Sequence, residues 1–122
     1  MSQSESICPS KLLVVFTTLP SEEAAKAMVH ILMEQNLAAC VQLMKGVQSI
    51  YRWEGRLCDE QEILLSAKTL ASKWPEILSV IQENHPYELP EIIAVSVERG
   101  LPEYLTWVAT ETAASPTADL PC

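Results

Sequence analysis

Hydrophobic and polar residues recur along the chain with two different periods, and each change of period marks an expected element. Residues Lys11–Thr17 are β-branched and aromatic, with apolar side chains at both parities, which predicts a strand buried on both faces. Ser21 is a suitable cap for a helix that ends near Asn36. The helical period places these residues on its apolar face: Ala24, Ala27, Met28, Ile31 and Leu32.

A long hairpin is expected in the middle of the chain. Ala38–Met44 and Val47–Trp53 show the alternation of one strand that is interrupted by a bulge. A short turn at Glu54–Arg56 leads to a third strand at Gln61–Thr69. In this third strand apolar residues alternate with polar ones, namely Glu62, Ser66 and Lys68.

The second half of the chain repeats the helix and strand pattern. A helix is predicted at Ser72–Asn84, a loop at His85–Pro90, and a strand with both parities apolar at Glu91–Val97. A short helix from Pro102 follows. The order β-α-β-β-α-β plus a C-terminal short helix predicts an α+β, ferredoxin-like domain with an antiparallel sheet.

The two outer helices of such a domain cover one face of the sheet only. The first and last strands are nevertheless apolar on both faces, and exposed apolar area costs about 25 cal/mol per Å². We therefore expect a homo-oligomer that covers the second face.

Composition and charge limit the classes of function. The chain has 122 residues, 48% of them hydrophobic, which fits one folded domain at residues 11–112 with a polar extension at 1–10 and a flexible tail at 113–122. Eight basic residues against 16 acidic ones give a net charge of −8, so no nucleic-acid partner is expected. Neither a signal peptide nor a membrane-spanning run is recognisable, which predicts no membrane association and a cytoplasmic location.

Glycine and cysteine usage narrows the chemistry further. With three glycines the chain contains no Gly-rich phosphate loop, and we expect no organic cofactor. The four cysteines form no Cys-x-x-Cys pair, so free thiols are expected.

Cys40 and His85 are the candidate pair for chemistry that involves a thiol and an imidazole. They suggest either a nucleophile with its base or, as sulfur and imidazole donors, ligands for copper or zinc. Cys40 lies in an apolar strand, where a cysteine is more often a small buried hydrophobic residue. We therefore predict that the protein is not an enzyme.

Two further segments are candidates for a binding site or a subunit contact. The loop His85–Glu91 holds two prolines, an imidazole, a phenol and two carboxylates, and the prolines restrict its motion. A rigid connection between helix and strand is the alternative interpretation. Tyr51 and Trp53 suit a ligand platform or, more commonly, an interface anchor.

Together these segments resemble the CutA divalent-cation-tolerance family. The matching pieces occur in order between Lys11 and Val108, and they are Leu37–Val41, Ser49–Gly55, Glu62 with Lys68–Thr69, His85–Ile92, and Tyr104–Leu105 with Trp107. The resemblance implies a ferredoxin-like protomer in a homotrimer, a role in the response to copper and other divalent cations, and no enzymatic activity. It also implies an interface or structural role for the motif residues Tyr51, Trp53, Lys68, Tyr87 and Trp107.

This chain has only some of the residues that are proposed as copper ligands in the family. Some family members have a cysteine at the end of the first strand and a His-His pair before the Pro-Tyr, proposed as copper ligands, where this chain has Thr17 and Asn84. His85 matches, so it is the main candidate ligand. Cys40, Glu91 or another subunit would have to supply the remaining donors.

Two other functions are compatible with this fold. A trimeric signalling domain of the PII type binds a small effector between subunits, but it has a long flexible loop between the second and third strands. Here that connection spans at most Glu54–Glu60. A non-catalytic scaffold is the other alternative.

Overall fold

The computed structural model describes residues 12–112, so the predicted 1–10 extension and 113–122 tail lie outside the described residues. The strands are β2 (Leu12–Leu19), β3 (Cys40–Trp53), β4 (Arg56–Leu70) and β5 (Ile92–Val97). The helices are α1 (Glu22–Glu34), α2 (Trp74–Asn84), preceded by a 3₁₀ turn at Ala71–Lys73, and α3 (Pro102–Glu111).

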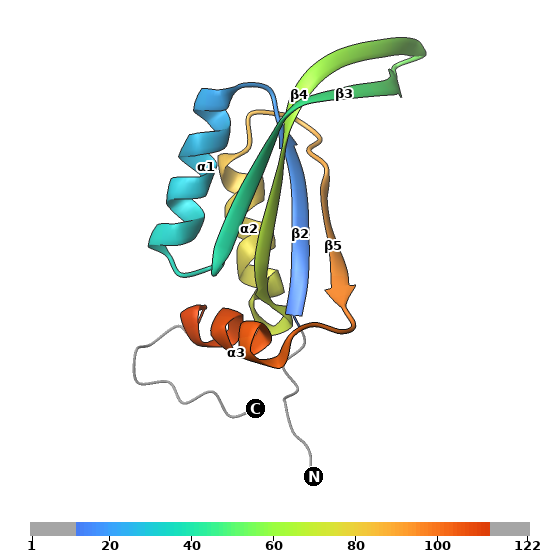
Figure 1. The fold of residues 1–122 in the computed structure, drawn as a ribbon. Coiled ribbons are helices and arrows are strands. Elements are labelled where there is room, and N and C mark those ends of the chain that lie inside the picture. The colour runs from blue at the N-terminus through green and yellow to red at the C-terminus, as the bar shows by residue number, and fades with distance from the viewer. Residues whose placement is uncertain (1–11, 113–122) are drawn as a thin grey trace.

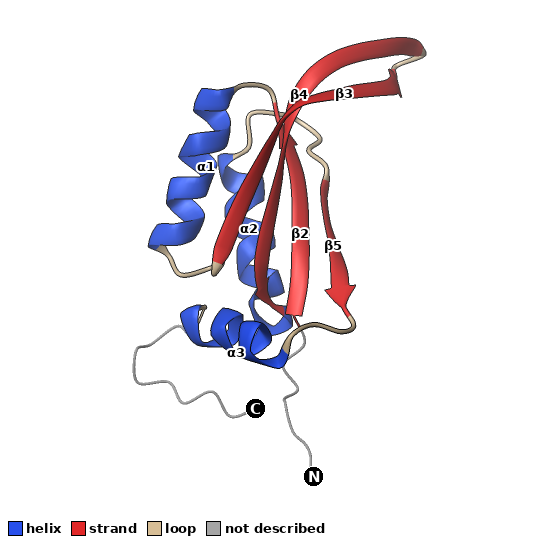
Figure 2. Ribbon diagram, in the orientation of Figure 1, coloured by secondary structure: helices blue, strands red, loops and turns tan. Residues whose placement is uncertain are grey.

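The four strands form one antiparallel sheet in the order β3-β4-β2-β5 (Figure 1). The sheet and the element order confirm the predicted α+β, ferredoxin-like domain. Helices α1 and α2 both lie against one face of the sheet, and α3 lies across one end (Figure 2).

The expected bulge is present in β3. The register with β4 shifts between Met44 and Val47, and Gly46 there adopts a φ of +75°. Bulges bend the strand that carries them, and beyond this point the paired β3 and β4 curve away from the sheet as a two-stranded arm (Figure 1). The bulge therefore sets the direction of the arm.

The hairpin is tighter and longer than the sequence pattern predicts. Its turn consists of Glu54 and Gly55, which both have positive φ as a type I′ turn requires. Strand β4 begins at Arg56, so the prediction that it starts at Gln61 was wrong. The additional residues are mostly polar and mostly exposed, apart from the exposed Leu57 and the half-buried Cys58, and main-chain pairing with β3 forms the strand there without an apolar alternation.

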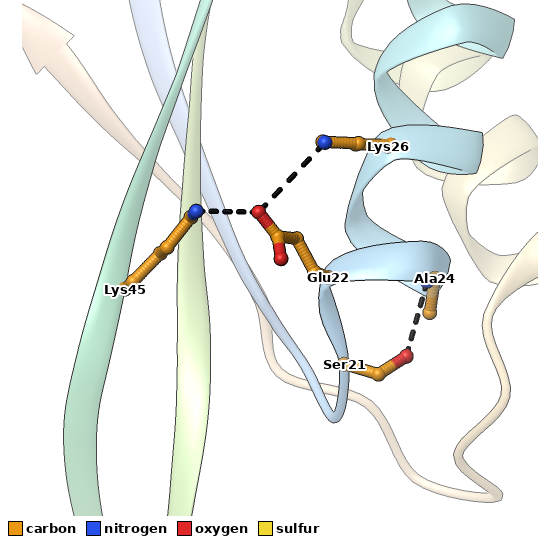
Figure 3. Close-up of polar contacts among 5 residues, drawn as sticks. All are labelled: Ser21, Glu22, Ala24, Lys26 and Lys45. Carbon is orange, nitrogen blue, oxygen red and sulfur yellow. Dashed lines mark hydrogen bonds and ion pairs between the residues drawn. The ribbon is translucent and has the colours of Figure 1, made fainter.

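Helix α1 begins as predicted, with the Ser21 hydroxyl accepting a hydrogen bond from the Ala24 amide at 3.1 Å (Figure 3). Glu22 is paired with Lys26 on the same helix and with Lys45 on β3 (Figure 3). The hydrogen bond and the charge of Lys45 lower the pKa of the Glu22 carboxyl group. These contacts join the start of the helix to the strand next to its bulge.

The helix-covered face of the sheet holds the main core. Ala25, Met28 and Leu32 of α1 are buried there, whereas Ala27, which was predicted on this face, is exposed. Ile77 and Ile81 contribute from α2. The sheet contributes Val15, Leu19, Ile63, Leu65 and Ala67.

Helix α3 covers a second, smaller cluster at one end of the sheet. Val108 is fully buried and packs with Leu12 of β2 and Leu70 of β4. None of the helices in the described part of the chain has the length and apolar character needed to cross a membrane.

The second face of the sheet is uncovered in the single chain. Side chains alternate between the faces of a strand, so the residues next to the core positions of β2 and β5 point away from the helices. Ile93 and Val95 of β5 are each 52% exposed there. We call this surface the open face, and it contains Val14, Phe16, Met44, Leu64, Ile93 and Val95.

Candidate functional site

A groove of about 810 Å³ lies between the β3–β4 arm and the loop that follows α2. Its volume is in the range of sites for small molecules. Most residues of the loop line the groove, which is compatible with the predicted binding site or subunit contact. The lining residues are Thr18, Ser49, Ile50, Tyr51, Trp53, Glu62, Pro86, Tyr87, Glu88, Leu89, Pro90 and Glu91.

His85 connects this loop to the end of β2 through Nε2, and its Nδ1 forms a hydrogen bond within the loop itself. Its Nδ1 accepts a hydrogen bond from the Tyr87 amide at 3.2 Å. In the neutral ring the proton is then on Nε2, which donates to the Thr18 carbonyl oxygen at 2.9 Å and lies 3.0 Å from the Thr17 hydroxyl. A metal ion could bind either nitrogen only by displacing one of these bonds.

Burial lowers the pKa of the His85 imidazole, against the opposing effects of the Thr18 carbonyl and the Glu62 charge. The neutral ring is therefore favoured in the folded protein. Protonation would also place an N–H on Nδ1, which now accepts a hydrogen bond from the Tyr87 amide. Two donors would then face each other.

We expect the stability of the protein to fall in mild acid because of His85. Its pKa is lower in the folded than in the unfolded chain, so the unfolded chain takes up the proton first as the pH falls. The stabilising contribution is complete above the ordinary histidine pKa of about 6.5 and is lost as the pH falls through the folded value. Urea unfolding midpoints from about pH 8 to about pH 5 measure this effect.

His85→Gln should remove much of this decrease. His30→Gln is the matched control, because His30 is exposed and its ring pairs with Glu34 one turn along the same helix. An unchanged pH dependence in the His85 variant would show that the ring is not the group responsible.

Tyr87 and Glu62 form the inner wall of the groove. The Tyr87 hydroxyl donates a short hydrogen bond of 2.6 Å to Glu62 Oε2. Burial and this bond raise the pKa of Tyr87, so the phenol stays protonated. Glu62 is only 7% exposed, although its place in a strand with alternating polarity predicts a solvent-facing side chain. The loop covers it, and contact between segments distant in sequence is not visible in a strand pattern.

Tyr51 and Trp53 contribute the aromatic side of the groove from the arm. The Tyr51 hydroxyl donates to Glu60 Oε1 at 3.0 Å, and this bond raises the pKa of Tyr51 to about 12. Both side chains remain partly exposed. Their predicted roles as platform or interface anchor are compatible with this position.

The structure does not bring Cys40 and His85 together within one chain. Cys40 is in register with Lys68, and Thr17, which contacts His85, is in register with Leu65. Cys40 and Thr17 are offset by three residues along β4 and by two strand spacings across the sheet. Together these offsets separate their backbone positions by about 14 Å. The donor atoms of two ligands on one metal ion lie within about 4.5 Å of each other. His85 lies beside Thr17, so Cys40 and His85 cannot share a metal ion, or act as nucleophile and base, in one protomer.

Glu91 lines the groove, but it does not complete a metal site there. Within residues 12–112 no group of three or more His, Cys, Asp or Glu side chains is arranged to hold a metal ion. Cys40 and Cys58 are free, as expected; Cys8 and Cys122 lie outside the described residues.

The other two motif residues lie away from the groove lining. Lys68 donates a hydrogen bond to Oε1 of Gln42 on the neighbouring strand β3. Trp107 packs beside Tyr104 on α3, with ring centroids 5.6 Å apart. Their predicted interface or structural roles stay predictions.

Sequence reasoning missed two parts of the site. Glu62 was a recognised motif residue without a role, and Thr17 was noted only for replacing a cysteine. Thr17 is fully buried and contacts His85. A polar residue in an otherwise apolar strand was the available signal.

The fold and groove define a small ferredoxin-like α+β protein with an open apolar sheet face and an acidic, aromatic groove. The model of the family described as CutA1 divalent ion tolerance protein matches residues 13–111. The chain therefore belongs to the CutA1 divalent ion tolerance family.

Individual relatives agree with this assignment. The divalent-cation tolerance protein CutA of Thermus thermophilus is 42% identical over 99 residues, which cover 81% of this chain and 96% of that protein. Protein CutA of the mouse is 38% identical, and the match covers 93% of this chain and 65% of the mouse protein. The crystal structure of CutA from Xylella fastidiosa has a TM-score of 0.81 at 42% identity, covering 84% of this chain and 98% of that one.

The connection between β3 and β4 bears on the alternative of a PII-type signalling domain. This connection is the two-residue turn Glu54–Gly55. It leaves no room for the long flexible loop expected of such a domain.

Proposed function

We propose that this protein acts in tolerance to divalent cations as a cytoplasmic homotrimer that binds copper or another divalent cation and catalyses no reaction. The family match over residues 13–111 carries this proposal. The quoted relative from Thermus thermophilus is named for divalent-cation tolerance, not for a reaction.

The open face supports assembly. It presents a row of apolar side chains on strands that already have a helix-covered face, and contiguous apolar surface of this kind is typical of an interface. Self-association of three copies would remove this surface from water.

The arrangement of donors supports a cation site made by more than one subunit. One chain does not gather three suitable ligands within its described residues, and Cys40 is too far from His85. Imidazole and thiolate are ligands that copper accepts, and a closed trimer can place donors of different subunits side by side.

We expect His85→Ala to weaken Cu(II) binding about tenfold, whether His85 is a ligand or orients one, since either role has effects of this size. A competition titration of the purified assembly with Cu(II) and a chromogenic chelator measures the affinity. His30→Ala is the control and should bind as the unmodified protein does. Equal affinities of all three proteins would remove His85 from the site.

A further inference from the structure

The contact between α1 and the bulge of β3 has a role beyond joining two elements. We propose that the ion pair of Glu22 with Lys45 is a clasp that fixes the angle of the β3–β4 arm at a hinge formed by the bulge. The arm carries one wall of the groove, so the clasp sets how far the two walls stand apart. This proposal does not depend on the trimer or on copper binding.

The arm is a two-stranded ribbon that extends beyond the other strands of the sheet. The last residue of β2, Leu19, pairs with Ile63, so residues 48–60 have no third strand beside them. In the described part of the chain, no hydrogen bond or ion pair connects residues 48–60 with a segment outside the arm. Side-chain hydrogen bonds stiffen the ribbon from within, and they are Gln48–Asp59 and Tyr51–Glu60. The arm can therefore move as one piece about its root.

The root of the arm has the features of a hinge. The register with β4 shifts between Met44 and Val47, so Lys45 and Gly46 have no register partner there. Gly46 has a φ of +75°, which glycine adopts without strain, and a Cβ at this position would meet no atom within 4 Å. An unpaired glycine in open space gives the backbone freedom to bend unless another contact restrains it.

Lys45 supplies such a restraint from inside the bulge. Its ammonium group pairs with the Glu22 carboxylate, which also pairs with Lys26 one turn along α1 at 3.7 Å (Figure 3). Among the ion pairs of residues 12–112, the Glu22–Lys45 pair alone joins segments distant in sequence, because the others join residues three or four positions apart. Helix α1 is packed on the core, so the clasp connects the hinge to a fixed point.

The angle of the arm determines the shape of the groove. Ser49, Tyr51 and Trp53 line the groove from the arm, and residues 86–91 line it from the loop. The loop is bonded to the end of β2 through His85, so its wall is fixed to the sheet. A change in the arm angle would therefore shift the aromatic side chains relative to the loop.

The test is ¹⁵N relaxation of the purified, deuterated protein, with relaxation dispersion for slower motion. We expect Lys45→Gln to lower the order parameters of the amides of residues 48–60 together, from about 0.85 for a rigid backbone toward about 0.6. In the unmodified protein, salt at about 1 M should loosen the arm in the same way, since it screens an exposed ion pair. The same salt should add nothing in Lys45→Gln.

Lys26→Gln is the matched control, because it removes the other partner of the same carboxylate and leaves the bulge unchanged. It should keep the order parameters of the unmodified protein, as should Lys45→Arg, which keeps the charge. Glu22→Gln should loosen the arm as Lys45→Gln does, and the double variant should loosen it no further, since each change breaks the same pair. An arm that is unchanged in Lys45→Gln, or loosened equally in Lys26→Gln, would overturn the proposal.

Discussion

Val95→Glu is expected to convert the proposed trimer, with three times the chain mass of 13.5 kDa, into a 13.5 kDa monomer. Val95 is 52% exposed on the open face and lies in register with Val14 of the neighbouring strand. In the proposed trimer a glutamate there would be enclosed without a partner, which costs several kcal/mol per subunit. Light scattering coupled to size-exclusion chromatography at micromolar concentration measures the mass.

Met33→Glu is the control for this experiment. Met33 is 42% exposed on α1, on the helical side of the sheet, so its replacement should leave the trimer intact. A trimeric Val95 variant would show that other surfaces hold the subunits together. A monomeric unmodified protein would contradict the proposed assembly itself.

Leu65→Ala is expected to lower the free energy of unfolding by about 3 kcal/mol. Leu65 is fully buried in β4, in register with Thr17 on one side and Leu43 on the other. Truncation removes apolar contacts and leaves a cavity between the sheet and its helices, which the rigid strands cannot close. Urea unfolding followed by circular dichroism at a fixed protein concentration measures the loss.

The same substitution elsewhere in β4 provides the comparison. Leu57 is 69% exposed on the arm, so Leu57→Ala should change the free energy of unfolding by no more than about 0.5 kcal/mol. A similar loss in both variants would mean that the arm is packed against another chain. Comparison of the two variants therefore tests both the packing of the core and whether the arm contacts another chain.

The sequence by itself determined the order of elements and the class of fold. Local signals were sufficient because each strand or helix has its own hydrophobic period and its own boundary residues. Ser21 caps α1, and Gly46 marks the bulge in β3. The two-sided apolar pattern of the first and last strands also predicted the uncovered sheet face. Strand pairing added the residues from Arg56 to Glu60, since two-stranded pairing there requires no apolar period.

Only the tertiary structure decided what the site is. Thr17, Glu62 and His85 lie far apart in sequence. The pairing of β2 with β4 and the contacts of the loop after α2 with both strands bring them together. The same geometry separates Cys40 from His85, a pair that residue type alone had suggested as ligands. Residue chemistry identifies possible donors, but hydrogen bonding and distance fix which of them act together, and both depend on contacts between segments that no local pattern encodes.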